Sequence, residues 1–249
     1  MKAAPTILVV DIGGTNVKCA LGTALGGRER RAKFPSGPGL RPERMIEDLR
    51  EATRDWKYDV VSIGYPGVVK AGKVARNPHN LGKGWVGFDF GRALRRPVRV
   101  VNDAAMQALG GYRGGRMLFL GLGTGLGTAL IVDGALVPLE LGHLRYSDTQ
   151  VFEDRIGEAA RLEIGNKRWR ARVREIVEEF RDALMPDEIL LGGGNSALLE
   201  DLPPQTRVGG NADAIRGGFR LWDERTGIGT RIARRARWGA EIVKRMLGN

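Results

Sequence analysis

Short apolar runs recur along the chain, and most of them are followed by a glycine or an aspartate. Their length suits buried β-strands rather than helices. We expect strands at residues 7–10, 60–63, 98–101, 118–122 and 188–191. Two further runs, residues 17–21 and 128–132, follow glycine-rich turns and are expected to return antiparallel to the run before them.

Apolar residues at helical spacing fill the stretches between these runs. Residues 41–56 and 151–184 show this spacing, the second with a break near Gly165, and residues 211–222 and 231–247 are further helix candidates. Strands that alternate with helices predict an α/β fold.

One sequence pattern occurs twice. Residues 10–15 and residues 120–125 each end an apolar strand in a turn rich in Gly and Thr, and they lie about 110 residues apart. Two such units predict a duplicated core with a cleft between the halves, where both turns face one ligand. A chance likeness of two glycine-rich hairpins is the alternative. We place a smaller N-terminal lobe at residues 1–110 and a larger C-terminal lobe at residues 111–249.

The composition is that of a globular chain with a basic surface. It is 42% hydrophobic, has 37 glycines and carries a formal net charge of +11. That charge favours a polyanionic partner such as nucleic acid, polyphosphate or an acidic membrane surface, and a basic surface that only keeps the protein soluble explains it equally well. The single cysteine, Cys19, excludes a disulfide framework and a cysteine-based zinc site. No stretch approaches the ~20 apolar residues of a membrane span, so we expect a cytoplasmic protein.

Both glycine turns suit phosphate binding. Without side chains in the way, backbone N–H groups can approach and surround an anion. The turns consist of Gly13, Gly14 and Thr15, and of Gly123, Thr124 and Gly125. Each is a weak signal by itself, because glycine also serves turn geometry. Neither turn has the Walker A spacing, and residues 121–127 lack the Rossmann spacing.

Two aspartates stand directly after or near the ends of predicted strands. Asp11 precedes the first glycine turn, where a carboxylate would repel phosphate unless a cation such as Mg²⁺ stood between them; an aspartate that caps its own turn is the alternative. Asp103 follows the strand at residues 98–101 and is expected to begin a helix. It could accept the proton of a substrate hydroxyl during phosphoryl transfer, and a plain helix cap is an equal alternative.

Glu140 and His143 place a carboxylate and an imidazole close together after a predicted hairpin. Such a pair suits hydrogen bonds to neighbouring hydroxyls of a sugar. A lone histidine is more often structural, and a zinc role for this one lacks partners.

Taken together, these motifs resemble those of the ROK family (repressors, open reading frames, kinases). The resemblance follows the family's order over roughly residues 6–222. Its motifs are residues 11–15, 63–67, 102–103, 121–127, 140–143 and 192–194. Residues 80–85 and 136–138, with the compact length, are most similar to the polyphosphate glucokinase branch.

The resemblance implies a two-lobed actin-like ATPase (ribonuclease H-like) fold, a homodimer, and phosphoryl transfer to the 6-hydroxyl of glucose or a close hexose. It implies Asp103 as the catalytic base. The implied sugar contacts are Gly67, Asn80, Asn102, Asp103, Glu140 and His143. The implied phosphate contacts are Asp11, Gly13, Gly14, Thr15, Lys18, Gly123, Thr124 and Gly125. Asp11 would hold Mg²⁺ indirectly, and Gly192, Gly193 and Gly194 would lie beside the nucleoside.

The chain also departs from the family pattern. Many members have a cysteine-rich zinc motif after the histidine, but residues 144–170 contain no cysteine, so no zinc is expected at His143. Many repressor members carry an N-terminal helix-turn-helix, for which the residues before Asp11 leave no room. Nucleic acid is therefore not expected as a partner. A membrane is not expected either, because no apolar stretch is long enough to span one.

The phosphoryl donor and the reaction itself stay open at this point. Residues 192–194 suit the adenine side of ATP, whereas the arginines at 168, 170, 172 and 174 and those near the C-terminus could form a basic track for polyphosphate. Two other functions compete with a kinase: a non-catalytic sugar sensor or regulator, and a phosphatase or exopolyphosphatase of the same superfamily.

Overall fold

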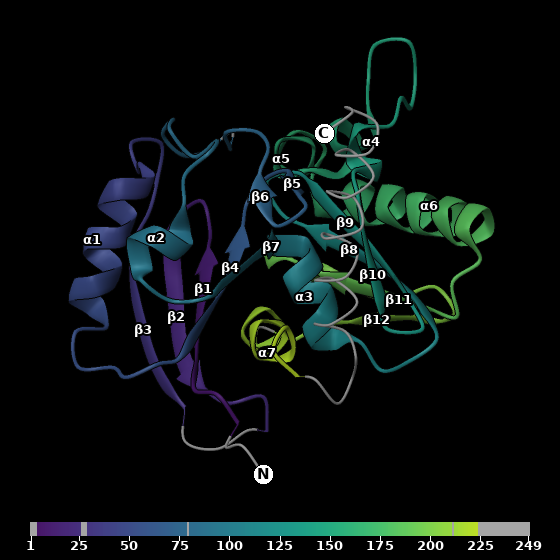
Figure 1. Ribbon diagram of the computed structural model, residues 1–249. Coiled ribbons are helices and arrows are strands. Elements are labelled where there is room, and N and C mark those ends of the chain that lie inside the picture. Colours follow the sequence, from purple (N-terminus) through teal and green to yellow (C-terminus); the bar gives the residue numbers. More distant parts are fainter. Residues whose placement is uncertain (1–3, 26–28, 79, 211, 224–249) are drawn as a thin grey trace, which may run out of the picture.

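The computed structural model describes residues 4–25, 29–78, 80–210 and 212–223 and contains two five-stranded mixed sheets (Figure 1). The first sheet has the strand order β3-β2-β1-β4-β7. Its strands are β1 (Ile7–Ile12), β2 (Asn16–Gly22), β3 (Arg30–Pro35), β4 (Val60–Tyr65) and β7 (Val98–Asn102). A small hairpin of β5 (Val69–Lys70) and β6 (Lys73–Val74) follows β4.

The second sheet repeats the plan of the first, with the order β10-β9-β8-β11-β12. Its strands are β8 (Arg116–Leu122), β9 (Leu126–Val132), β10 (Ala135–Leu139), β11 (Glu188–Gly192) and β12 (Thr206–Val208). In each sheet the first three strands form an antiparallel meander and the last two pair parallel. The register also agrees, because Asp11 pairs with Lys18 and Gly64 as Gly121 pairs with Gly127 and Gly192. The predicted duplication of the core is confirmed.

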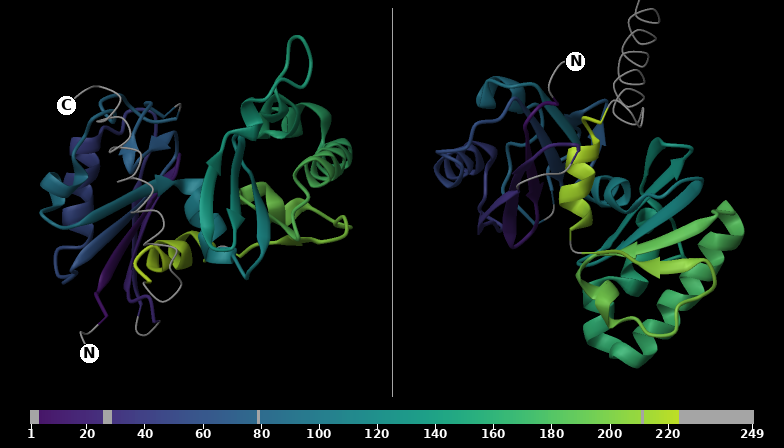
Figure 2. Two further views of the ribbon diagram at one scale, coloured as in Figure 1. Left: turned by 45° about the vertical axis from the view of Figure 1, so that its right-hand side comes forward. Right: turned by 90° about the horizontal axis from the view of Figure 1, so that it is seen from below.

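Helices cover both faces of each sheet, which explains why the strands are continuous apolar runs. The helices are α1 (Pro42–Ala52), α2 (Phe90–Leu94), α3 (Asp103–Gly111), α4 (Phe152–Ile156), α5 (Glu158–Ile164), α6 (Asn166–Leu184) and α7 (Asp213–Arg220). Short 3₁₀ turns follow β10 and β11 (Leu141–His143 and Gly194–Leu198). α1 lies on the outer face of the first sheet and α6 on that of the second, and α3 and α7 lie between the two sheets (Figure 2).

Three apolar cores follow from this layering. Successive strand residues point to opposite faces, so Ile7 and Val9 join the central core around α3 and α7, whereas Leu8 and Val10 join the core beneath α1. The third core lies between the second sheet and α6. The central core contains residues of both sheets, so it connects the two halves.

The structure refines several predicted elements. The helical stretch at 151–184 divides into three helices, with breaks at Gly157 and at Gly165, where φ is +78°. The candidate at 211–222 contains α7, and the candidate at 231–247 lies outside the described residues. The predicted division between residues 110 and 111 falls in the last turn of α3 and stays a prediction. None of the helices described here has the length and apolar character needed to cross a membrane.

Candidate active site

The ends of several strands from both sheets meet at a cleft of about 320 Å³. Eleven of the predicted residues line it: Gly14, Gly67, Asn80, Asn102, Asp103, Gly123, Thr124, Gly125, Glu140, His143 and Gly193. The other predicted residues do not line the cleft: Asp11, Gly13, Thr15, Lys18, Gly192 and Gly194. The chain therefore brings residues from both sheets to one place, although they are far apart in sequence.

Asn102 fixes the start of α3 in this cleft. Its side-chain oxygen accepts a hydrogen bond from the N–H of Ala105 at 3.2 Å, which caps the helix. Its Nδ2 donates to the carbonyl oxygen of Gly67 at 3.1 Å, so the same side chain also holds the turn after β4. Asp103 is consequently the first residue of α3, directly at the mouth of the cleft.

The environment of Asp103 makes its carboxyl group hard to ionise. Burial raises its pKa to about 7, with smaller contributions from the negative charges of Asp11 and Glu140. The N–H of Ala104, which donates to Oδ1 at 2.8 Å, acts in the opposite direction. A carboxyl group with a pKa near neutrality can both take and release a proton at physiological pH, as a general base must.

Asp11 lies near the end of β1, close enough to Asp103 for its charge to act there. Burial raises its pKa as well, and Lys18 across the hairpin opposes that rise. Gly64 lies between Asp11 and α3: a Cβ there would be in contact with Oδ1 of Asp11 at 3.5 Å and would displace Cε of Met106. The carboxylates of Asp11 and Asp103 are thus both poorly solvated and repel each other, and a cation near them would stabilise their charged forms.

In the part of the chain that the structure describes, no group of three or more His, Cys, Asp or Glu side chains is arranged to hold a metal ion. The residues nevertheless fit Mg²⁺, which usually keeps several waters and takes one or two carboxylates together with phosphate oxygens. Asp11, near the end of β1, offers such a carboxylate, although it does not line the cleft itself.

The first glycine turn is held from outside by a neighbouring segment. The N–H of Gly13 donates to the carbonyl oxygen of Asn16, and Ser36 donates from its hydroxyl to the carbonyl of Gly13 and from its N–H to that of Thr15. A Cβ at Gly13 would lie only 2.9 Å from that Asn16 oxygen. Gly14 and Thr15 are left exposed at the tip.

The second glycine turn is packed against α4 and α5. The N–H of Glu158 donates to the carbonyl oxygen of Gly123 at 3.0 Å. A Cβ at Gly125 would overlap Oε2 of Glu153, so a larger residue there would displace the Glu153 carboxylate. Thr124 is exposed at the tip, and all three residues of the turn line the cleft.

An imidazole flanked by two carboxylates forms the wall opposite the first sheet. Nδ1 of His143 lies 3.6 Å from Oε2 of Glu140, and Nε2 lies 3.7 Å from Oε1 of Glu153. Burial raises the pKa of Glu140, while the neighbouring His143 lowers it. All three side chains line the cleft and can bind hydroxyl groups.

Sequence reasoning missed Glu153, because no motif marks it. It lies in the first turn of α4, where an acidic residue is ordinary. Its Oε2 accepts a hydrogen bond from the N–H of Leu126 at 3.3 Å, which fixes it beside the second turn. Arg76, Asn77 and Gln107 also line the cleft and were not predicted.

The glycines at the end of β11, Gly192 and Gly193, allow close packing against neighbouring residues of β8. A Cβ at Gly192 would lie 2.6 Å from the ring of Phe119, and one at Gly193, where φ is +81°, would overlap the backbone of Leu122. Gly193 alone of the three lines the cleft, and Gly194 begins the following 3₁₀ turn. Their expected place beside a nucleoside stays a prediction.

Comparison with known proteins agrees with this geometry. Residues 7–151 match the ROK family. The polyphosphate glucokinase of Mycobacterium tuberculosis (strain CDC 1551 / Oshkosh) is 27% identical over 216 residues, which cover 78% of this chain and 80% of that protein. The polyphosphate glucokinase of Mycobacterium leprae (strain TN) is 27% identical over 208 residues, which cover 75% of this chain. The match spans 63% of the Mycobacterium leprae protein, less than two thirds of its length.

The fold has solved relatives as well. The crystal structure of an inorganic polyphosphate/ATP-glucomannokinase from Arthrobacter sp. strain KM superposes with a TM-score of 0.75 at 26% sequence identity. The superposition covers 90% of this chain and 100% of the Arthrobacter chain.

Proposed function

The chain belongs to the ROK family and has the actin-like ATPase fold of the family's sugar kinases, and on that premise we propose that it phosphorylates a hexose. The acceptor in this proposal is the 6-hydroxyl of glucose or a close relative. The observation that carries it is Asp103, a half-buried carboxyl group whose pKa is raised to about 7, in a cleft that both glycine turns border.

Asp103 is the catalytic base in this reaction. As the sugar oxygen attacks the phosphorus, the hydroxyl proton passes to the carboxylate of Asp103, and the bond from the phosphoryl group to the donor breaks. Asn102, Glu140, His143 and Glu153 would orient the sugar through its other hydroxyls, with Gly67 and Asn80 at the rim of the same cleft. In phosphoryl transfer the protein accelerates the reaction mostly by positioning the two substrates and by neutralising the charge on the phosphoryl group.

The two glycine turns would bind the phosphates of the donor. The exposed tips at Gly14, Thr15 and Thr124 can present backbone N–H groups and hydroxyls to an anion. Asp11 would hold Mg²⁺, which neutralises charge on the transferred phosphoryl group when it is bound. Lys18, opposite Asp11 in the hairpin, adds a positive charge to this side.

Polyphosphate, ATP or both are the donors in this proposal. The two mycobacterial relatives carry polyphosphate in their names, and the Arthrobacter relative carries polyphosphate and ATP. The net charge of +11 favours attraction of a polyanion. A homodimer, which the family resemblance implies, and a cytoplasmic location, which the sequence analysis expects, complete the proposal.

The test is a panel of donors and sugars, with hexose 6-phosphate as the measured product. We expect turnover with glucose and with polyphosphate, ATP or both. Sugar binding without any phosphorylated product, under every donor, would instead favour a sugar-sensing regulator. Release of phosphate from polyphosphate in the absence of sugar would favour a phosphatase.

A further inference from the structure

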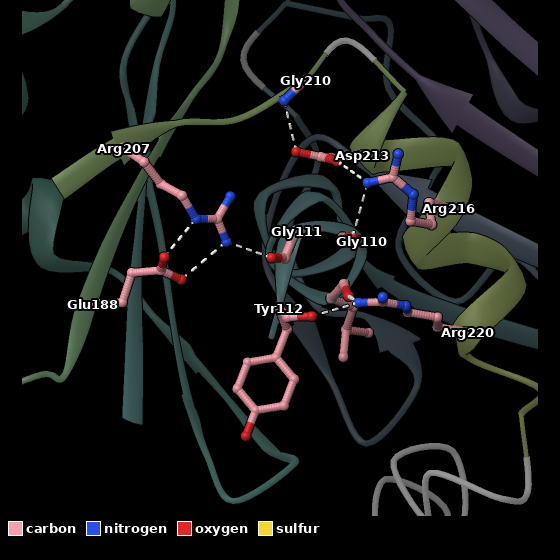
Figure 3. Close-up of polar contacts among 10 residues, drawn as sticks. Gly110, Gly111, Tyr112, Glu188, Arg207, Gly210, Asp213, Arg216 and Arg220 are labelled. Carbon is pink, nitrogen blue, oxygen red and sulfur yellow. Dashed lines mark hydrogen bonds and ion pairs between the residues drawn. The ribbon is translucent and has the colours of Figure 1, made fainter. Parts of the chain in front are cut away.

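The C-terminal end of α3 is held by three arginines (Figure 3). The last carbonyl groups of a helix have no partner within it and need other donors. Many helices end in a glycine with positive φ that satisfies them. α3 instead continues into Tyr112 with an extended backbone (φ −62°, ψ 135°), and side chains from β12 and α7 supply the donors.

Arg207 on β12 reaches the last residue of α3. Its Nη2 donates to the carbonyl oxygen of Gly111 at 2.5 Å. The same guanidinium forms two bonds to the carboxylate of Glu188 on β11, from Nε at 2.5 Å and from Nη2 at 2.9 Å. Both side chains are about three quarters buried (21% and 27% exposed), so the bonds have little competition from water.

Arg216 and Arg220 reach the same end from α7. Nη1 of Arg216 donates to Oδ1 of Asp213 at 2.6 Å and to the carbonyl oxygen of Gly110 at 3.4 Å. Nη1 of Arg220 donates to the carbonyl oxygens of Leu109 at 2.6 Å and Tyr112 at 2.8 Å. Arg220 is half-buried, and this burial together with the neighbouring Arg216 lowers its pKa.

Backbone contacts make α3 a rigid connection between this end and the cleft. α3 crosses α7 so closely that a Cβ at Gly110 would overlap the backbone of Asp213, and one at Gly217 would overlap the backbone of Met106. At the other end, a Cβ at Gly127 would lie 2.8 Å from Cβ of Ala104, the residue after Asp103. A helix packed without free space moves as one body, so a shift at its C-terminal end also moves its first residue.

We propose that Arg207, Arg216 and Arg220 are positioning residues, which keep Asp103 in its reactive place by holding the opposite end of α3. The proposal rests on the proposed function in its role for Asp103. The three cations also complement the negative end of the helix dipole, which stabilises α3 in this position. None of the three lines the cleft, so their effect on the reaction passes through the helix.

The experiment replaces Arg220 by Met, which has a similar length and no donor, in the full-length protein. We expect kcat to fall about tenfold or more, because displacements of about 1 Å at a reacting group cost rates of that size. The KM for sugar should stay within about threefold, since the sugar contacts come from other elements. Arg220→Lys, which keeps a donor and a charge, should recover part of kcat.

Arg50 provides the matched control. Its Nη2 donates to the carbonyl oxygen of Ala93, in the last turn of α2, at 2.7 Å. Arg50→Met therefore removes the same kind of bond far from α3 and should leave kcat within about twofold. If Arg220→Met loses only thermal stability, as this control does, and keeps its kcat, the arginines are merely structural and the proposal is wrong.

Amide hydrogen exchange separates this proposal from the kinase assignment. Arg220→Met should speed exchange in α3, up to Ala104 and Ala105 beside Asp103, by about tenfold, while α6 stays unchanged. If the wild-type protein has no kinase activity, the kinase assignment is wrong, and the exchange rates in α3 still test whether the arginines hold the helix. Unchanged exchange at Ala104 and Ala105 would overturn the positioning proposal whether or not the protein is a kinase. If Arg220→Met does not fold, Arg220→Lys carries both measurements, with smaller changes in the same direction expected and no change contradicting the proposal.

Discussion

Two aspartates, the half-buried Asp103 and the buried Asp213, occupy corresponding places in the two halves of the molecule. Asp103 begins α3, which follows the last strand of the first sheet, and Asp213 begins α7, which follows the last strand of the second. Asp213 accepts a hydrogen bond from the N–H of Gly210 at 2.8 Å and pairs with Arg216 at 2.6 Å. Asp103 instead lies in the field of two other carboxylates, Asp11 and Glu140.

The two halves therefore share a backbone fold, while the residues around the corresponding aspartates differ. Each carboxyl group lies at the start of a helix and is at least half-buried, so its position in the helix does not distinguish the two. The neighbouring charges do. The first strands of the two sheets differ in the same way, because Asp11 in β1 occupies the position that Gly121 occupies in β8. The first half thus carries the two aspartates of the proposed phosphoryl transfer, and the second half supplies the carboxylates proposed to bind the sugar, Glu140 and Glu153, together with the arginines at the end of α3.

The largest expected difference concerns catalysis. Asp103→Asn should lower kcat by about 10²–10⁴-fold, because the amide keeps the shape of the side chain and cannot take a proton. Sugar affinity, measured by calorimetry, should stay within about tenfold. The same change at the corresponding place, Asp213→Asn, should cost less than about tenfold in kcat. Equal losses in the two variants would break the comparison.

The next difference concerns folding stability. Asp213→Asn weakens an ion pair between the buried Asp213 and the half-exposed Arg216, and also the bond from Gly210, so it should lower the free energy of unfolding by about 1–2 kcal/mol. Urea denaturation at pH 8 measures this value. A loss below about 0.5 kcal/mol would mean that the pair does not stabilise this half.

Asp103→Asn should change stability in the opposite direction at alkaline pH. The pKa of Asp103 is about 7 in the folded protein, above its ordinary value of 3.8, so the folded state holds the proton more tightly than the unfolded chain does. This contribution to stability is complete below about pH 4 and is lost as pH rises through about 7. At pH 8 the variant should therefore be more stable than the wild type by up to about 4 kcal/mol, since each unit of pKa difference corresponds to about 1.4 kcal/mol, and this gain should vanish near pH 4. A gain that does not depend on pH would contradict the assignment of the pKa to Asp103.

The smallest expected effect is a shift in the pH profile of kcat/KM. Activity should rise with pH through about 7, as Asp103 loses its proton. Asp11→Asn removes a neighbouring negative charge and should move the midpoint of this rise to lower pH, by less than about one unit. The midpoint is the measured quantity, because loss of the Mg²⁺ ligand lowers the rate itself. A midpoint that moves to higher pH would exclude Asp11 as a source of the raised pKa.

Much of the frame could be predicted from the sequence. The inner strands are buried on both faces, so their residues are uniformly apolar, and the glycine turns that end them are marked by composition. β3 was missed because it lies at an edge, where Ala32 and Phe34 alone face the core and the other residues are charged or, at its end, proline. β12 is three residues long, too short for a periodicity to register.

The residues of the site were predictable only where a motif identifies them. Asp103 stands between a strand and a helix, next to an asparagine that caps, and that context is local in sequence. Glu153 reaches the cleft because Gly125 and Gly142 let α4 approach, a contact that depends on tertiary packing. The three arginines at the end of α3 left no signal either, because their partners are backbone carbonyls, which every residue has.

The placement of the two central helices has a consequence for how the chain can be divided. α7, from the second half, packs against the first sheet, where Ser62 donates to the carbonyl of Gly218. A Cβ at Gly218 would overlap Val9 of the same sheet. α3, from the first half, packs in turn against the second sheet, with Gly111 beside Leu190. The last helix of each repeat thus packs against the sheet of the other repeat, as in a domain-swapped dimer whose two protomers are joined into one chain. Neither half expressed alone could cover its own sheet, whereas the two halves supplied as separate chains are expected to complement each other and restore the fold.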